Sequence, residues 1–225
     1  MADERIRAER AAELQAERAE TLRVQLDRLV PLTGDERVLD VGTGTGAIAL
    51  ALAPLVREVI GFDESEERLA LAREGAPENA TFQAGDASSL PFEMGSFDLV
   101  TCVRTLHHVR RPEVVIAELV RVTRLGGRLL VVDQLAPVET LEALELDRFE
   151  RARDPSHNRL LSDGDLRAMF EMNGLVTLAN ETVHESRELA RYLDLAACEG
   201  EERTRAESLA PIEIELDVGW YLLRR

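Results

Sequence analysis

The feature that most constrains the fold is a regular alternation of short apolar runs and helix-forming segments between residues 37 and 132. Each apolar run has the length of a buried strand, and a helical stretch separates most neighbouring runs. Strands that alternate with helices build a parallel sheet covered on both faces, and such sheets bind ligands at the carboxyl ends of their strands. The predicted strands are 37–41, 58–62, 80–84, 97–102 and 128–132, and the predicted helices are 47–53, 65–74 and 112–123.

The two ends of the chain differ from this central part. Residues 3–30 are rich in Ala, Glu and Arg and contain neither Gly nor Pro, which predicts a helix. We treat 1–30 as a unit that either packs on the main domain through one stripe or forms a lid over the ligand cleft. Residues 31–225 are expected to form one domain. Beyond residue 137 the predicted elements are helices at 138–153 and 163–173, a strand at 175–182, a helix at 185–197, a surface turn at 199–202 and a strand at 212–223.

Composition narrows the classes of partner. The chain has 225 residues and a formal net charge of -16, and 45% of its residues are hydrophobic, which is ordinary for a globular domain. A surface this acidic repels phosphate backbones and anionic lipids, so we expect neither a nucleic acid nor a membrane as partner. We expect a monomer or a homodimer.

Targeting and redox signals favour the cytoplasm. No stretch reaches the roughly 20 apolar residues that a bilayer requires, and the start of the chain lacks the apolar core of a secretory signal. Two cysteines, Cys102 and Cys198, make no disulfide framework, which suits a reducing compartment. The sequence contains no lysine, so every lysine-based mechanism is excluded.

A glycine-rich turn follows the first predicted strand, in the segment Asp40-Val41-Gly42-Thr43-Gly44-Thr45-Gly46-Ala47. Glycines here let the backbone approach a ligand and adopt positive φ, and the following helix offers N–H groups to it. By itself the spacing also fits a dinucleotide-binding turn. Asp63 ends the second strand, where a carboxylate could accept hydrogen bonds from ribose hydroxyls. Gly85-Asp86-Ala87 follows the third strand, where a carboxylate could receive an adenine amine.

These blocks, together with Leu90-Pro91-Phe92 and the run from Gly95 to Val100, resemble the class I S-adenosylmethionine-dependent methyltransferases of the ubiquinone/menaquinone-biosynthesis-like group. The resemblance runs from about Val38 to Asp133, with several blocks in the same order. It implies a doubly wound α/β fold with seven strands, mostly parallel, and an antiparallel last strand. Its cofactor would be S-adenosyl-L-methionine, with S-adenosyl-L-homocysteine as product. The segment Arg121 to Gly127 looks like the family's R-V-L-K-P-G-G turn, although Thr123, Arg124 and Leu125 depart from it.

The resemblance also implies which residues meet the methionine part of the cofactor. Gly42, Gly44 and Gly46 would form the turn beneath it, and Asp40 would lie toward its amino group. Thr105, after the fourth strand, would sit near the transferable methyl.

For the nucleoside, the resemblance implies four residues on the next two strands. Asp63 would hold the ribose hydroxyls, with Glu64 beside it. Asp86 would bind the adenine amine, and the backbone N–H of Ala87 would meet the ring.

Histidines supply the candidate catalytic groups. His107 and His108 are adjacent and, on an extended segment, would point to opposite sides, so we expect no shared metal; no Cys/His cluster has zinc spacing either. The resemblance makes residues 138–173 a cap on the acceptor side, and it includes a D-P-S-H segment that contains His157. His157 or His107 could serve as a base for an acceptor that arrives protonated. The alternatives are a polar surface loop for His157 and a backbone-bonding role for His107.

The sequence therefore predicts methyl transfer to an oxygen, nitrogen or carbon of a small molecule. An NAD(P)-dependent oxidoreductase is the main alternative, because the glycine spacing and Asp63 would suit it. Against this alternative, a chain without lysine cannot have the Tyr-x-x-x-Lys pair of such oxidoreductases. An oxidoreductase would also leave the Gly85-Asp86-Ala87 block unexplained. A non-catalytic protein that binds the same cofactor is a third possibility, which a damaged glycine turn would favour.

Overall fold

The computed structural model describes Ile6 and residues 24–225. Most of the predicted N-terminal helix, including the segment that could form a lid, lies outside the described residues. Residues 24–29 are helical, and the buried side chains of Leu26 and Val30 pack on the domain. This end of the segment therefore belongs to the core of the domain.

The domain is built on one seven-stranded sheet with the order β3-β2-β1-β4-β5-β7-β6. The pairings from β3 across to β5 are parallel, and β7 runs antiparallel to both β5 and β6. The predicted doubly wound sheet with an antiparallel last strand is thus confirmed. The strands are β1 (Arg37–Val41), β2 (Glu58–Asp63), β3 (Ala80–Ala84), β4 (Phe97–Val103), β5 (Thr123–Gln134), β6 (Val176–Arg187) and β7 (Ile214–Arg224).

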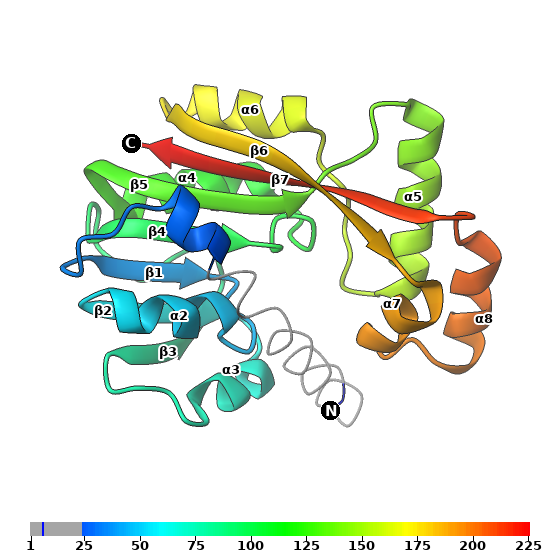
Figure 1. Cartoon of the computed structure of the whole chain (residues 1–225), viewed down its shortest axis with the longest axis horizontal. Helices are drawn as coiled ribbons and strands as arrows, with labels where there is room; N and C mark the ends of the chain where they lie inside the picture. The colour runs from blue at the N-terminus through cyan, green and yellow to red at the C-terminus, as the bar shows by residue number, and fades with distance from the viewer. Residues whose placement is uncertain (1–5, 7–23) are drawn as a thin grey trace.

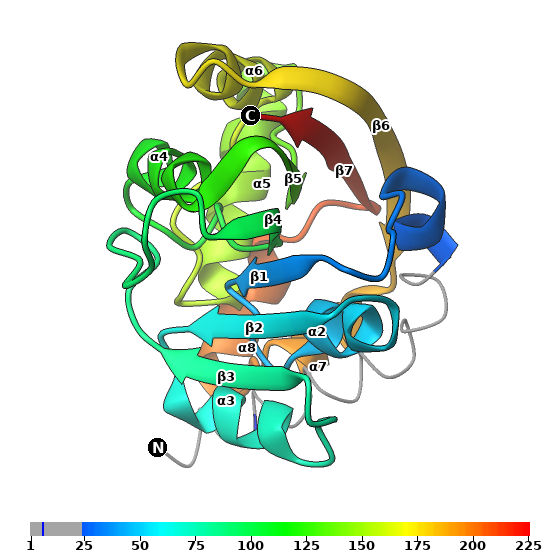
Figure 2. The same cartoon turned by 90° about the vertical axis from the view of Figure 1, so that its left-hand side faces the viewer.

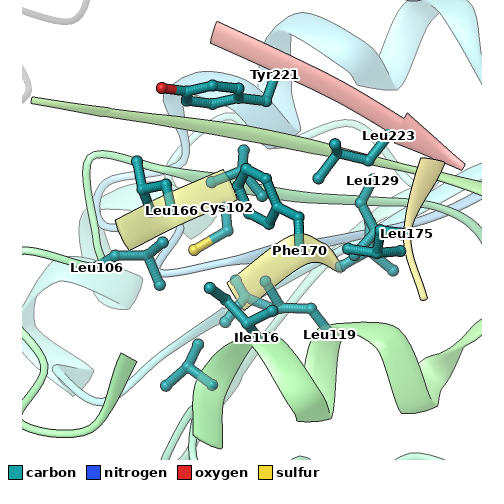
Figure 3. Packing of buried hydrophobic residues seen from close by; sticks show 14 of the residues in the cluster. Cys102, Leu106, Ile116, Leu119, Leu129, Leu166, Phe170, Leu175, Tyr221 and Leu223 are labelled. Carbon is teal, nitrogen blue, oxygen red and sulfur yellow. The ribbon is translucent and has the colours of Figure 1, made fainter. Parts of the chain in front are cut away.

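Helices cover both faces of the sheet, as the alternating pattern predicts (Figure 2). Val38 of β1 faces the layer that contains α2 and residues 24–30, while its neighbour Leu39 faces the layer of α4 and α6. Figure 3 shows the second layer, where Phe170 of α6 packs among Leu119 of α4 and Tyr221 of β7. The helices are α2 (Ala47–Leu52), η1 (Ala53–Leu55), α3 (Glu66–Arg73), α4 (Pro112–Val122), α5 (Thr140–Arg153), α6 (Asp163–Met172), α7 (Leu189–Leu195) and α8 (Gly200–Leu209).

The last part of the chain departs from the predicted elements. The helix expected at 185–197 begins only at Leu189, because β6 continues to Arg187 beside β7. The segment 199–202, predicted as a surface turn, opens the helix α8. The helix α8 is stabilised by a small third hydrophobic core, because Ala206 on its inner face is buried in the same cluster as Phe149 of α5.

The cap of the domain consists of α5, α7 and α8. In Figure 1 these helices lie beyond the arrowheads of β1, β4 and β5, and therefore at the carboxyl edge of the sheet. The strand order reverses between β1 and β4, and ligands of open α/β sheets bind at this switch point. In the described part of the chain no helix is long and apolar enough to cross a membrane.

Candidate active site

The glycine turn lies at the switch point and is closely packed. Gly42, Gly44 and Gly46 all have positive φ, at 72°, 55° and 89°. The amides of Gly42 and Thr43 donate to the Phe62 carbonyl of β2 at 2.7 and 3.1 Å. A Cβ on Gly42 would lie 2.1 Å from Thr105 Oγ1, so the turn directly contacts the segment that follows β4. Two of the predicted cofactor contacts, Gly42 and Thr105, thus meet across the switch point.

Asp40 lies beneath this turn and is 1% exposed. Its two carboxylate oxygens accept hydrogen bonds from Thr43 Oγ1 and Thr101 Oγ1, each at 2.6 Å. Burial raises the pKa of Asp40 to about 6; the two hydroxyls oppose this shift, and the nearby charge of Asp63 adds to it. The Asp40 carboxylate therefore holds the glycine turn in place through its hydrogen bond from Thr43.

The buried Asp40 makes stability depend on pH in a defined direction. Its folded pKa is raised above the ordinary value of 3.8, so the native state binds the proton more tightly than the unfolded state. The stability that this proton supplies is present below about pH 4 and is lost as the pH rises to about 6. Relative to Asp40→Asn, the wild-type free energy of unfolding should fall by about 1–3 kcal/mol over this range. Urea unfolding of both proteins from pH 4 to 7 measures the difference, and parallel pH curves would contradict the assignment.

The predicted nucleoside-binding residues lie at the ends of β2 and β3. Asp63 is buried, and its carboxylate accepts from the amides of Gly44 at 2.8 Å and Ser65 at 3.0 Å. Glu64, next in the chain, is exposed. Asp86 is exposed after β3, and hydrogen bonds from Ser88 lower the pKa of its carboxyl. Asp63 thereby fastens the glycine turn to the edge of the sheet.

This edge has the features that an adenosine-containing cofactor needs. The three positive-φ glycines leave their positions in the turn without side chains, and Asp63 and Asp86 supply acceptors for hydroxyl and amine groups. Ala87 is half-buried beside Asp86, and Thr105 lies on the opposite side of the turn. The residues present therefore fit the cofactor that the sequence predicts.

A histidine–aspartate pair follows β4 and ends β5. His107 Nδ1 is hydrogen-bonded to Asp133 Oδ1, and the His107 amide donates to Asp133 Oδ2 at 3.2 Å. The Asp133 side chain is 1% exposed; burial would raise its pKa, but the charge and hydrogen bond of His107 bring the pKa below its ordinary value. An ionised carboxylate only accepts, so Nδ1 carries a hydrogen, and Nε2 is the ring nitrogen that would exchange a proton with an acceptor. No hydrogen bond to Nε2 is found from the described residues.

His108 and His157 surround this pair. The expectation that His107 and His108 point to opposite sides is wrong, because they lie in a turn and their ring centroids are 4.1 Å apart. Burial lowers the pKa of His108 to about 3, so its ring is neutral at pH 7. The His157 ring lies 5.6 Å from that of His107, and its Nε2 is 2.9 Å from Asp147 Oδ1.

The environment of His157 excludes the surface-loop alternative. Its side chain is only 1% exposed, and burial lowers its pKa despite the hydrogen bond to Asp147. Neither aspartate partner was among the predicted site residues. Asp133 ends an apolar strand just as Asp63 does, a signal that could have revealed it. Asp147 lies within a helix of mixed charge and carries no such signal.

The described residues hold no group of three histidine, cysteine or carboxylate side chains placed to bind a metal ion.

Comparisons with known proteins agree with this architecture. Residues 39–131 match the family model described as a methyltransferase domain. The "uncharacterized methyltransferase YcgJ" of Bacillus subtilis (strain 168) is 41% identical over 145 residues, which are 63% of this chain and 57% of that protein. A demethylmenaquinone methyltransferase of Clavibacter sepedonicus is 34% identical over 142 residues, or 62% and 58% of the two chains. These matches span less than two thirds of the length of either relative.

Solved structures extend the similarity to the whole fold. A proposed methyltransferase from Bacillus halodurans C-125 has a TM-score of 0.84 and 27% identity, over 90% of this chain and 97% of that one. The YcgJ protein has a TM-score of 0.77 and 28% identity, over 89% and 94%. The [4+2]-cyclase SpnF shares the fold at 22% identity and a TM-score of 0.71, over 91% and 80%. The glycine turn and the blocks that follow it lie inside the matched residues, so this part of the chain is similar to a methyltransferase domain, and the fold as a whole is that of the methyltransferase structures named above.

Proposed function

We propose that this protein transfers a methyl group from S-adenosyl-L-methionine to an oxygen, nitrogen or carbon nucleophile of a small molecule. The observation that carries the proposal is the pair His107–Asp133, which follows β4 and ends β5 beside the Thr105–Gly42 contact. A base would thus stand next to the turn that is assigned to the methionine part of the cofactor.

When bound, the cofactor supplies an electrophilic methyl on a sulfonium, whose carbon–sulfur electrons return to sulfur as the acceptor forms its new bond to the methyl. Asp63 and Glu64 would hold the ribose, and Asp86 with Ala87 the adenine. Gly42, Gly44 and Gly46 would cradle the methionine part, with Asp40 holding the turn through Thr43. Most of the rate enhancement would come from orientation of the two reactants.

His107 is the better of the two predicted bases. Its Nδ1–H is held by Asp133, so Nε2 can take the acceptor's proton, and the carboxylate stabilises the imidazolium that forms. His157 is the second candidate, but its Nε2 already contacts Asp147 and its side chain is almost fully buried. We therefore assign the proton transfer to His107.

The acceptor class follows from what such a base can do. A phenol, a quinol or an activated ring carbon loses a proton on methylation, whereas a neutral amine attacks without prior help. Two relatives are named demethylmenaquinone methyltransferase and 27-O-demethylrifamycin SV methyltransferase, and the second name places the methyl group on an oxygen. We propose a phenol or quinol as acceptor, held beneath the cap formed by α5, α7 and α8; of the predicted acceptor-side segment 138–173, α6 packs on the face of the sheet instead.

The choice of cofactor distinguishes the proposed methyltransferase from an NAD(P)-dependent oxidoreductase. Saturating S-adenosyl-L-homocysteine should raise the melting temperature by roughly 5–10 °C, because it binds only the folded state. NADH at the same concentration should not. A shift with NADH and none with S-adenosyl-L-homocysteine would overturn the proposal.

Variants connect that binding to the proposed site. Asp63→Ala should weaken S-adenosyl-L-homocysteine by roughly 1–3 kcal/mol in calorimetry, because the ribose loses a charged acceptor. Glu78→Ala, an exposed carboxylate before β3, is the matched control. Label transfer from methyl-tritiated cofactor to a panel of phenols, quinols and small amines then tests catalysis. If the cofactor binds at this site but no panel member is methylated, the result favours the alternative of a non-catalytic protein that binds the same cofactor.

A further inference from the structure

The segment 154–160, which we call the cap loop, is fastened to α5 through one carboxylate. Asp147 Oδ1 accepts from His157 Nε2 at 2.9 Å and from the Leu160 amide at 3.0 Å. One turn further along α5, Arg151 Nε donates to the Asn158 carbonyl at 3.0 Å. Three residues of the cap loop are thus held by a single helix face.

The other side of the cap loop is bonded to the histidine turn after β4. The amides of Asn158 and Arg159 donate to the His107 carbonyl at 2.9 and 3.2 Å. Ser156 Oγ lies 3.0 Å from His108 Nδ1. The backbone that carries His107 is therefore held from the cap, while its imidazole is held from the sheet by Asp133.

His157 contributes to this arrangement through the hydrogen bond that its ring donates. The ring is buried, its Nε2 contacts Asp147, and it lies 5.6 Å from the His107 ring. We propose that His157 and Asp147 are positioning residues that fasten the cap loop against His107 and keep its imidazole in the orientation in which Nδ1 bonds Asp133 and Nε2 stays open. This inference rests on the proposed role of His107 as base, and it assigns His157 a role other than proton transfer.

The two roles differ in what glutamine can replace. The Nε2 atom of a glutamine lies at nearly the same distance from the backbone as the Nε2 atom of a histidine, so its N–H can donate to Asp147. An amide cannot take up a proton at neutral pH, however. If His157 positions the loop, His157→Gln should behave like the wild type and His157→Ala should not. If His157 were a base, both variants would fail alike.

Imidazole ¹⁵N spectra of the free protein give a readout that needs no acceptor. In the wild type and in His157→Gln, the two His107 nitrogens should show distinct shifts, one protonated and one not. In His157→Ala and Asp147→Ala they should move toward a common average as the ring loses its fixed tautomer. Exposed His184 on β6 also pairs with an aspartate, Asp217, so His184→Ala is the matched control and should leave the His107 signals unchanged.

Kinetics then test the same idea with an accepted substrate. His157→Ala should lower the turnover number roughly 10-fold or more, and His157→Gln should restore it to within about 3-fold of the wild type. Unchanged affinity for S-adenosyl-L-homocysteine shows that each variant is folded. Unchanged His107 signals in His157→Ala, or equal failure of the Ala and Gln variants, would overturn the positioning role. A wild type that methylates nothing would instead count against the proposed function.

Discussion

His107→Gly should lower the turnover number of methyl transfer to a phenol or quinol by roughly 10²–10⁴-fold. The variant removes an imidazole whose Nδ1 is bonded to the buried Asp133 carboxylate and whose Nε2 has no hydrogen bond from the described residues. Binding of S-adenosyl-L-homocysteine, followed by calorimetry, should persist because Asp63 and the glycine turn are untouched. Initial rates at saturating cofactor measure the loss.

Chemical rescue shows whether the loss is one of basicity. Imidazole added to His107→Gly should fill the space left by the ring and recover part of the turnover. Asp133→Asn should also slow the reaction, because an amide can donate to Nδ1 and favour the wrong tautomer. Full turnover in His107→Gly would mean that orientation alone drives the reaction. His184→Gly, on the exposed face of β6, serves as the unaffected reference.

Gly42→Ala should destabilise the protein by roughly 2–4 kcal/mol, which corresponds to a melting temperature lower by about 4–16 °C. The added Cβ would lie 2.1 Å from Thr105 Oγ1, and alanine must also adopt a φ of +72°. The displaced turn should in addition bind S-adenosyl-L-homocysteine at least 10-fold more weakly. Thermal unfolding and calorimetry measure the two effects.

The chain offers a control that isolates the contact from the backbone strain. Gly75 has the same φ of +72°, but nothing lies within 4 Å of an added Cβ. Gly75→Ala should therefore report only the cost of the left-handed conformation, about 1–2 kcal/mol. Thr105→Gly combined with Gly42→Ala should recover much of the difference between the two. Equal effects of Gly42→Ala and Gly75→Ala would show that the Thr105 contact relaxes without cost.

The parallel half of the sheet could be predicted closely because its signals are local. Apolar runs bounded by turns define the limits of β1, β2, β3 and β4 to within one residue. Their carboxyl ends all meet at one edge, so Asp63 and the glycine turn could be placed together from order alone. The predicted helix 65–74 likewise begins where expected, because Ser65 is its N-cap and accepts from the Arg68 amide at 3.3 Å.

The cap could not be predicted in this way, because long-range packing decides it. Gly200 resembles a breaker, yet α8 begins there since Ala206 completes a core with residues of α5. The aspartate partners of the two candidate bases are also hard to predict, because they lie far away in the sequence or in a segment with no recognisable motif. Asp133 lies 26 residues from His107, and nothing in the sequence connects Asp147 to the imidazole ten residues later.

The place of the cap in the topology has a consequence for the design of new activities. Antiparallel strands such as β6 and β7 need only a two-residue link, yet here 26 residues, 188–213, carry α7 and α8 between them. The other cap segment, 135–162, enters and leaves at the same edge of the sheet, between β5 and α6. Both segments therefore extend from the frame of the sheet, and they share a core with Ile214 and Leu216 of β7. Under the proposed function, grafting the two segments together with the histidine turn from a related chain should exchange the acceptor preference and leave binding of S-adenosyl-L-homocysteine unchanged.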